Sequence, residues 1–313
     1  MTDARIPIGI TAWQTERWSA EALSTQGRLA EELGFHSYWL PENHFGDERS
    51  VPSPLTLLAA VAATTHRLKL ATTSYLLPIR HPLQAAEEVA VLDQLCEGRL
   101  ILGLGRGVQG DLFNAFDIDP KAKRGLFASK LDVMRSAWAG EALTDTKGDK
   151  ATRLAPLPVQ QPSPPLWVAA FGPLALKQAG SLGLPYLASP LEPLAKLVEN
   201  YQLHAEAAVE AGMPVPTERP VMRTVFINED ARLCQRVAEA LERRLPPQFR
   251  QDGVEIGDWA IIGSANEAHD RLMNYRDDLG INLLIAGGRL PALEETALRA
   301  NLEACAALSL PVD

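Results

Sequence analysis

An arginine between two glycines is the clearest candidate for ligand binding in this chain. Arg106 follows the apolar run Arg99–Leu104, which is typical of a buried strand. Gly105 and Gly107 on either side allow unusual backbone angles and a close approach of a ligand to the main chain. The guanidinium could bind a phosphate through two parallel N–H donors. A surface arginine in a loop is the alternative.

A polar pair follows the predicted strand Ser37–Glu42. Imidazole exchanges protons near neutral pH, so His44 could act as an acid or a base. Asn43 can hold an oxygen species only by hydrogen bonds, because an amide does not take up a proton in that range. The alternative for His44 is a packed side chain with one ring nitrogen bonded to the backbone. Glu42 could be a buried partner of Arg106 or an adjacent donor.

Two other strand ends offer groups for a binding site. Ala170, Phe171 and Gly172 lead into Pro173, which suits the first position of a helix. The free N–H groups of a helix N-terminus bind anions, so this turn is a second candidate for phosphate binding. Trp13, at the end of a predicted N-terminal strand, is a candidate for the wall of a substrate pocket.

Strand and helix patterns alternate along the whole chain. The apolar runs that predict strands are Ile6–Trp13, Ser37–Glu42, Lys69–Leu77, Arg99–Leu104, Leu166–Ala170, Tyr186–Ser189, Pro220–Asn228 and Ile281–Ala286. The segments with helical spacing are Ala20–Leu33, Pro54–Thr64, Pro82–Glu97, Arg124–Ala139, Pro173–Leu182, Pro193–Ala211, Ala265–Leu279 and Ala292–Ala306. Eight strands, each followed by a helix, favour an α/β fold of the (β/α)8 TIM-barrel type over a doubly wound sheet. No linker is visible, so we expect a single domain over residues 1–313.

Two stretches interrupt this alternation. Glu141–Pro165, before the fifth strand, is polar and then proline-rich. Between the seventh and eighth strands, Asp230–Leu245 predicts an extra helix, and Pro246–Ile262 after it is interpreted as a loop. Long insertions are often lids or binding loops, and a surface excursion without a role is an equal alternative.

Composition excludes several classes of protein. The net charge of −9 and the pI near 5.3 argue against nucleic acid or a membrane surface as partner. The three cysteines are far apart, which predicts no disulfide framework and a reducing, cytoplasmic setting. No secretory signal and no apolar run of about 18 residues is visible.

The six histidines lack metal-ligand spacing, so no metal is expected. A G-x-G-x-x-G pattern begins at Gly105, but the stretch after it is too short for the crossover helix of a dinucleotide fold.

Four sequence blocks, in register, resemble the bacterial luciferase-like flavin-dependent oxidoreductases. They read GFHSYWLPENHFG, LLPIRHPLQAAEEVAVLDQLCEGRLILGLGRG, PLPVQQPSPPLWVAAFGP and GSANEAHDRLMNYRDDLGINLLIAGG. The family implies a TIM barrel that binds reduced FMN, or in one branch the deazaflavin F420, at its C-terminal mouth. Many members are homodimers built through the helices after strands two and three, and we expect the same here.

The resemblance also assigns roles to residues. Thr73–Ser74 matches a dipeptide that often forms a non-prolyl cis peptide or bulge beneath the isoalloxazine ring, whereas the residues alone indicate an ordinary strand end. Arg106 matches the position that binds the flavin phosphate. Asn43 stands where luciferases carry the histidine implicated in catalysis, so light emission is not expected. At Ala170–Phe171 the acidic and hydroxyl side chains of the luciferases are missing, and only backbone donors remain.

The activity implied by the resemblance is monooxygenation. Reduced FMN from a separate reductase would react with O2 to give a flavin C4a-hydroperoxide. The barrel mouth would shield this adduct while a small organic substrate is oxygenated. An F420-dependent hydride-transfer oxidoreductase and a non-catalytic flavin-binding barrel are the alternatives.

Overall fold

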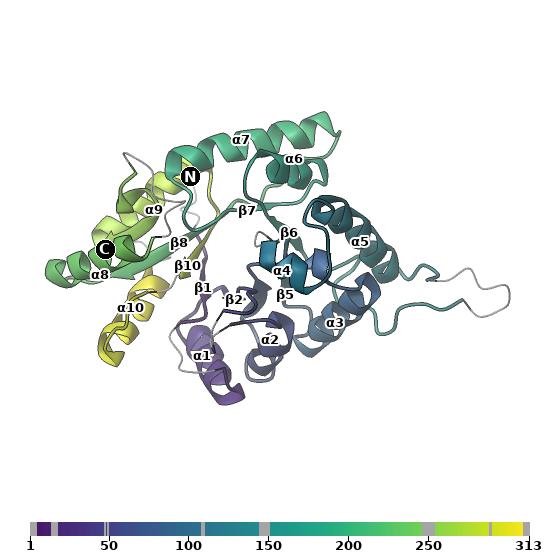
Figure 1. Cartoon of the computed structure of the whole chain (residues 1–313). Helices are drawn as coiled ribbons and strands as arrows, with labels where there is room; N and C mark the ends of the chain where they lie inside the picture. Colours follow the sequence, from purple (N-terminus) through teal and green to yellow (C-terminus); the bar gives the residue numbers. More distant parts are fainter. Residues whose placement is uncertain are drawn as a thin grey trace. The chain divides into compact units, whose positions relative to one another are not determined.

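The computed structural model describes residues 5–13, 18–46, 48, 50–107, 110–143, 151–245, 254–287 and 290–308. The chain divides into two compact units, whose elements are labelled in Figure 1. Unit 1 comprises Met1–Thr15, Leu29–Tyr38 and Ala170–Asp313, and unit 2 comprises Glu16–Arg28 and Trp39–Ala169. No helix in the described part of the chain is long and apolar enough to cross a membrane.

Strands and helices alternate along the chain, as predicted. The strands are β1 (Ile8–Thr11), β2 (Ser37–Leu40), β3 (Lys69–Thr72), β4 (Tyr75–Leu76), β5 (Leu100–Gly105), β6 (Leu166–Ala169), β7 (Tyr186–Leu187), β8 (Pro220–Ile227), β9 (Ala260–Gly263) and β10 (Leu283–Gly287). The helices are α1 (Ala20–Glu32), α2 (Pro54–Ala62), α3 (Pro82–Leu95), α4 (Gly110–Ala115), α5 (Lys123–Trp138), α6 (Pro173–Ser181), α7 (Leu194–Glu210), α8 (Ala231–Arg244), α9 (Ala265–Leu279) and α10 (Glu295–Ala307). All eight predicted strands occur, and the third is split into β3 and β4. Closure of the strands into a (β/α)8 barrel stays a prediction.

Two elements differ from the sequence prediction. The helix α4 has only six residues, too few for a helical apolar period to show in the sequence. The strand β9 lies at the end of Pro246–Ile262, so the prediction of a loop over this whole range is wrong there. Its four residues pair with β8. Residues 246–253 of the predicted loop lie outside the described residues.

Unit 2 holds the carboxyl ends of several neighbouring strands at one edge. The strand order is β6-β5-β3-β2, and β4 also pairs with β5. Strands β3, β4 and β6 all run parallel to β5, so their carboxyl ends meet at the same edge of the sheet. Trp39 of β2 is fully buried with its ring centroid 5.4 Å from that of Trp167. Trp138 of α5 donates from Nε1 to the carbonyl oxygen of Ala86 in α3 at 3.1 Å. These contacts make a rigid support for the strand ends.

Unit 1 contains a second set of parallel strands. Their order is β1-β10-β8-β9, and all three pairings are parallel. Every residue of β8 is buried, as expected of a strand covered on both faces. The helix α8 buries its apolar side in a cluster that includes Phe226 and Trp259. The helix α9 begins with a capping box, in which Ser264 and Glu267 each bind the backbone N–H of the other.

The insertion Glu141–Pro165 is fastened to the core of unit 2. Gln160 donates from its backbone N and its Nε2 to the two carboxylate oxygens of buried Asp93, at 2.9 and 2.8 Å. The same Nε2 lies 2.8 Å from the carbonyl oxygen of Leu100. Residues 144–150 lie outside the described residues. The described proline-rich part is therefore held against α3 and β5.

Candidate active site

The third strand of unit 2 is interrupted between β3 and β4. The Thr73–Ser74 peptide bond is cis, and the register against β5 shifts by one residue across it. Ser74 is buried against Gly105, where an added Cβ would lie 2.9 Å from the Cβ of Ser74. Glycine is therefore required at position 105. The conformation that the resemblance implies is confirmed, and its role beneath a flavin stays a prediction.

Three cationic side chains crowd together after β5. The pKa of Arg106 is lowered, first by burial and then by the positive charge of Arg124. The pKa of Lys123 is lowered by burial and then by the charge of Arg106. Lys123 donates from Nζ to the carbonyl oxygen of Gly107 at 3.2 Å. A partly buried group of like charges is unfavourable, and a bound anion such as phosphate would relieve it.

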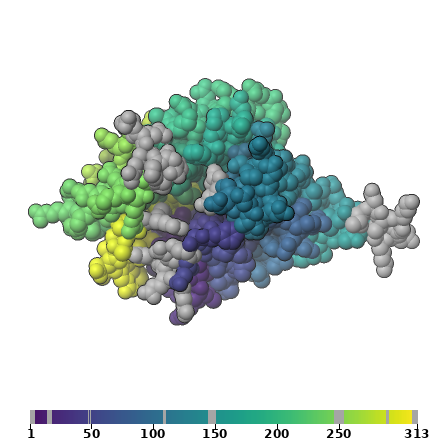
Figure 2. Space-filling view, in the orientation of Figure 1, coloured from purple at the N-terminus to yellow at the C-terminus, as the bar shows by residue number. Residues whose placement is uncertain are grey.

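The prediction from sequence included Arg106 but missed Lys123 and Arg124. A weak signal was present, because Lys121, Lys123 and Arg124 fall within four residues at the start of a predicted helix. Figure 2 shows the segment of α4 and the beginning of α5, in blue to teal, at the surface of unit 2. Lys123 reaches the carbonyl oxygen of Gly107, 16 positions earlier in the chain, and the apolar pattern does not indicate this contact.

The side chain of Asn43 holds the loop after β2. Its Oδ1 accepts a hydrogen bond from the backbone N of Val51 at 2.6 Å, and its own backbone N donates to the carbonyl oxygen of Val51 at 3.1 Å. The amide oxygen is thus engaged in a structural pair. Binding of an oxygen species by Asn43 stays a prediction, and it would have to use the amide N–H groups.

The imidazole of His44 is oriented by a carboxylate. Its Nε2 lies 2.7 Å from Oε1 of Glu42. The same Oε1 accepts a hydrogen bond from Nη1 of Arg80 at 2.8 Å, and Oε2 accepts one from the backbone N of Leu76 at 3.0 Å. The sequence left open whether Glu42 pairs with Arg106 or with an adjacent donor. In the structure its side-chain partners include Arg80 and the nearby His44. An acid–base role for His44 stays a prediction.

Two exposed aromatic rings flank His44. The side chains of Phe45 and Phe116 are 71% and 38% exposed. Their ring centroids lie 5.7 and 5.4 Å from that of His44, and 6.0 Å from each other. Phe45 has a φ of 56°, a backbone region that residues other than glycine seldom adopt. Exposed apolar rings beside a possible acid–base group offer a surface to an organic molecule. The spacing of Phe45 and Phe116 in the sequence does not indicate that their rings lie together.

The other predicted site residues belong to unit 1. Gly172 has a φ of 80° and precedes α6, which has no side-chain cap. Ala170 is buried, whereas Phe171 is exposed. The predicted helix N-terminus is therefore present, and its binding of phosphate stays a prediction. Trp13 is half-buried, with its ring centroid 6.2 Å from that of Tyr38 in an edge-on contact.

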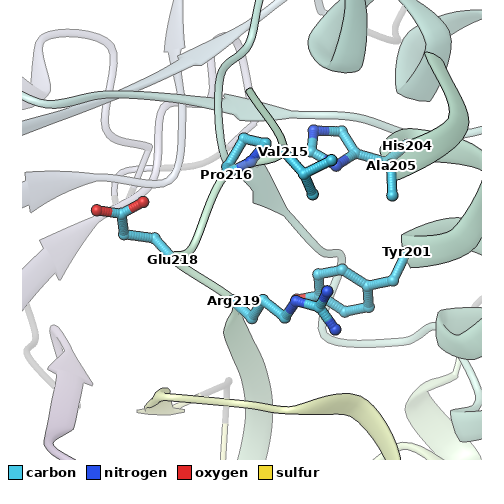
Figure 3. A pocket seen from close by; sticks show the side chains of 7 residues that line it. All are labelled: Tyr201, His204, Ala205, Val215, Pro216, Glu218 and Arg219. Carbon is cyan, nitrogen blue, oxygen red and sulfur yellow. The ribbon is translucent and has the colours of Figure 1, made fainter. Parts of the chain in front are cut away.

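A small cavity in unit 1 is a separate feature (Figure 3). Its volume is about 10 Å³, and it is lined by Tyr201, His204, Ala205, Val215, Pro216, Glu218 and Arg219. The hydroxyl of Tyr201 donates to the carbonyl oxygen of Pro220 at 2.7 Å, and Nε2 of His204 lies 2.8 Å from the carbonyl oxygen of Leu184. The cavity has room for a single water molecule at most, so it is not a cofactor site. The residues that the structure describes include no group of three or more His, Cys, Asp or Glu side chains that could hold a metal ion.

Residues 6–282 match the family described as luciferase-like monooxygenase, so the chain belongs to that family. It is 33% identical over 190 residues to limonene 1,2-monooxygenase of Rhodococcus erythropolis, a match that covers 59% of this chain and 49% of that protein. It is 27% identical over 233 residues to the oxygenase component of the flavin-dependent trigonelline monooxygenase of Acinetobacter baylyi, with 71% of this chain and 64% of that protein covered. The chain thus matches about half to two thirds of the length of these relatives.

Two solved structures share the fold over almost the whole chain. The oxygenating constituent of 3,6-diketocamphane monooxygenase from Pseudomonas putida, a complex with FMN, has a TM-score of 0.81 at 20% identity and covers 96% of both chains. An F420-dependent secondary alcohol dehydrogenase has a TM-score of 0.77 at 20% identity and covers 96% of this chain and 99% of its own. At these identities the likeness establishes the fold and leaves the choice of cofactor to chemical argument.

Proposed function

We propose that the protein is a flavin-dependent monooxygenase that receives reduced FMN from a separate reductase and uses O2 to oxygenate a small organic substrate. The observation that carries this proposal is the cluster of Arg106, Lys123 and Arg124 beside the bulge at Thr73–Ser74. A terminal phosphate brings close to two negative charges, which the crowded cations would neutralise. The family of the chain and its flavin-dependent relative support the same activity.

The roles of the side chains follow from their positions. Thr73 and Ser74 would support the isoalloxazine ring, since the side chain of Ser74 packs against Gly105. Bound reduced FMN would supply the activation of O2. In unit 2, the side chains proposed to bind its phosphate are Arg106, Lys123 and Arg124. The backbone N–H groups of Ala170, Phe171 and Gly172 belong to unit 1, and phosphate binding by them is a separate proposal.

The substrate side of the proposed site is formed by other residues. Asn43 would donate an amide hydrogen bond to an oxygen atom, and His44 would move a proton. Phe45 and Phe116 present apolar rings next to His44, which suits an organic substrate. Trp13 belongs to unit 1, and its part in the wall of a substrate pocket is a separate proposal.

Anaerobic titration of the protein, followed by flavin fluorescence, tests the cofactor. The ligands are reduced FMN, reduced F420 and reduced riboflavin, which is FMN without its phosphate. Charge-assisted hydrogen bonds contribute about 1.5–3 kcal/mol each, so we expect FMN to bind about 10- to 100-fold more tightly than riboflavin. Arg106→Ala should remove most of this difference. Arg135→Ala, a change at the far end of α5, should retain it.

Each other outcome contradicts a defined part of the proposal. Binding of F420 alone would replace oxygenation by hydride transfer. Tight binding of FMN without substrate-dependent O2 consumption would indicate a non-catalytic flavin-binding protein. Limonene and trigonelline, named in the relatives, are the first substrates to test. If no flavin binds at high micromolar concentration, the proposed function is wrong.

We also propose a homodimer in the cytoplasm. Val91 and Leu95 on α3 are 44% and 57% exposed, and such apolar side chains on a helix after the third strand fit a subunit interface. All three cysteines are free, which fits a reducing compartment. Sedimentation equilibrium should give a dimer for the wild-type protein and a monomer for the double variant Val91→Glu, Leu95→Glu.

A further inference from the structure

A buried carboxylate with three donors lies behind the candidate acid–base residue. The side chain of Glu42 is completely buried, and that of His44 is 8% exposed. Both oxygens of Glu42 accept hydrogen bonds, one from Leu76 N and the other from Arg80 and His44. The full negative charge of this buried group is balanced by the guanidinium of Arg80.

Arg80 is itself held in one position. Its Nη1 also donates to the carbonyl oxygen of Leu76 at 2.8 Å. Its guanidinium carbon lies 3.8 Å from the ring centroid of Tyr75, whose hydroxyl donates to Glu88 at 2.9 Å. Lys130 donates to the carbonyl oxygen of Arg80 at 2.7 Å. Since these contacts fix Arg80, they also fix the carboxylate of Glu42 that faces the imidazole.

This arrangement determines which nitrogen of neutral His44 carries the proton. An ionised carboxylate only accepts hydrogen bonds, so Nε2 of His44 must be the donor to Glu42. The lone pair of the neutral imidazole is then on Nδ1. In the part of the chain that the structure describes, Nδ1 has no hydrogen-bond partner, and the exposed rings of Phe45 and Phe116 flank the same imidazole.

We propose that Glu42 and Arg80 are positioning residues that hold His44 in its Nε2–H tautomer, so that Nδ1 is the atom that exchanges protons with the substrate. A proton leaves an O–H or C–H bond of the substrate and forms an N–H bond at Nδ1. The resulting imidazolium is stabilised by its hydrogen bond to Glu42 and later returns the same proton, so His44 undergoes no net change and no electrons pass through it. The kinetic part of this proposal rests on the proposed oxygenase function, whereas the tautomer does not.

The tautomer is measurable in the protein without any flavin. Nuclear magnetic resonance of ring-labelled histidine distinguishes an N–H nitrogen from a nitrogen with a lone pair. His44→Gln identifies the His44 signals among those of the six histidines. At a pH where the imidazole is neutral, we expect one tautomer, with the proton on Nε2. Glu42→Gln should give a mixture or the reverse tautomer, while Glu87→Gln on the exposed side of α3 should leave the signals unchanged.

A second pair of variants decides the question if Glu42→Gln does not fold. Arg80→Met removes the cation that holds Glu42 and should disturb the tautomer, whereas Arg80→Lys keeps a cation and should restore it in part. Either of two results overturns the proposal. The first is a wild-type His44 with its proton on Nδ1 or with mixed tautomers. The second is an unchanged tautomer both in Arg80→Met and in any folded Glu42→Gln.

Kinetics then test the use of Nδ1. General acid–base catalysis contributes typically about 10²- to 10⁴-fold. We expect the misplaced tautomer of Glu42→Gln to lower kcat at least 10-fold, with the KM of the substrate and the Kd of FMN changed less than twofold. An equal loss in flavin binding would assign Glu42 to the scaffold and overturn the positioning role. If wild-type protein binds no flavin, the proposed function fails, and the tautomer measurement still stands by itself.

Discussion

Two arginines, one in each unit, lie in different electrostatic environments. Arg223 in unit 1 is fully buried, and all three of its nitrogens donate hydrogen bonds, to Tyr275 and to the carbonyl oxygens of Pro190, Met222 and Glu192. Arg106 in unit 2 lies near two further cations, and its pKa is lowered. The first arginine is used by the fold. The second lies among like charges, which would favour the binding of an anion from outside.

The carboxylate near Arg223 strengthens this contrast. Glu192 accepts hydrogen bonds from Tyr186, from Ser189 N and from Asn200, at 2.7 to 2.8 Å. Burial raises its pKa, and the charge of Arg223 opposes that shift. Unit 1 thus places opposite charges and donors together, as expected of a buried network that stabilises a fold. Arg223 thus belongs to a network of opposite charges, whereas Arg106 lies among like charges.

The largest expected effect is on the structural arginine. Arg223→Met removes the positive charge near the buried carboxylate of Glu192 and leaves the carbonyl oxygens of Pro190, Met222 and Glu192 without these donors, so the free energy of unfolding should fall by about 3–5 kcal/mol. Arg106→Ala, which removes one of several like charges, should change it by less than about 1 kcal/mol. Urea denaturation at low ionic strength measures both. An equal loss in the free energy of unfolding in the two variants would contradict the proposed difference between Arg223 and Arg106.

A smaller effect is expected at the glycine beside the bulge. Gly105→Ala forces a Cβ against Ser74, and such overpacking costs about 1–3 kcal/mol. The matched control is Gly125→Ala in α5, where nothing lies within 4 Å of an added Cβ. That change should stabilise the protein by about 0.5–1 kcal/mol, since alanine favours a helix interior. A stabilising Gly105→Ala, measured by the same denaturation, would contradict the packing described here.

Inorganic phosphate should bind at Arg106 and not at Arg223, and this binding should stabilise the folded protein. At a concentration ten times its Kd, an anion bound to the folded state adds about 1.4 kcal/mol, which raises Tm by a few degrees. We expect this rise in the wild-type protein and in Arg135→Ala, and its loss in Arg106→Ala. Thermal unfolding followed by circular dichroism measures it, with sodium chloride at matched ionic strength as reference. The same rise in Arg106→Ala would place the anion elsewhere.

The smallest effect concerns His204, in the wall of the cavity of unit 1. Its pKa is lowered, mainly by burial, with the bond to Leu184 acting in the opposite direction. The folded state therefore favours the neutral ring, and the unfolded state binds more protons below the ordinary histidine pKa of about 6.5. Stability should fall as the pH decreases through that value, and this fall should be weaker in His204→Gln. The exposed His66→Gln serves as control, and an identical pH dependence in all three proteins would contradict the prediction.

The sequence predicted those parts of the site that lie within one continuous motif. Arg106 and Thr73–Ser74 belong to strand ends, and the order of parallel strands brings such ends to one edge of a sheet. The pairing of Glu42 with Arg80 could not be predicted, because the two residues are 38 positions apart and their contact depends on how the segment after β4 turns back. Lys123 was missed for a similar reason, since α4 is too short to leave a periodic pattern.

The fold was predicted where apolar runs were long enough to be unambiguous. The helix α9 has its predicted bounds, because a capping box begins it and Gly280 in a left-handed conformation follows its end. The strand β9 has only four residues directly before that cap, and within the described residues it pairs with β8 alone. The strand is defined by its pairing with β8, which is distant in sequence, and a local sequence pattern does not show such a pairing.

The three buried thiols allow the rate of local opening to be measured at separate places in the molecule. Cys96 lies in unit 2, whereas Cys234 and Cys305 lie in unit 1, and burial raises the pKa of all three, to about 12 for Cys305. Alkylating reagents attack the thiolate, so each cysteine reacts only after its surroundings have opened to water. The rate of labelling at Cys96 therefore reports local opening in unit 2, and the rate at Cys305 reports local opening in unit 1. An anion that binds at Arg106 should slow the first rate and leave the second unchanged.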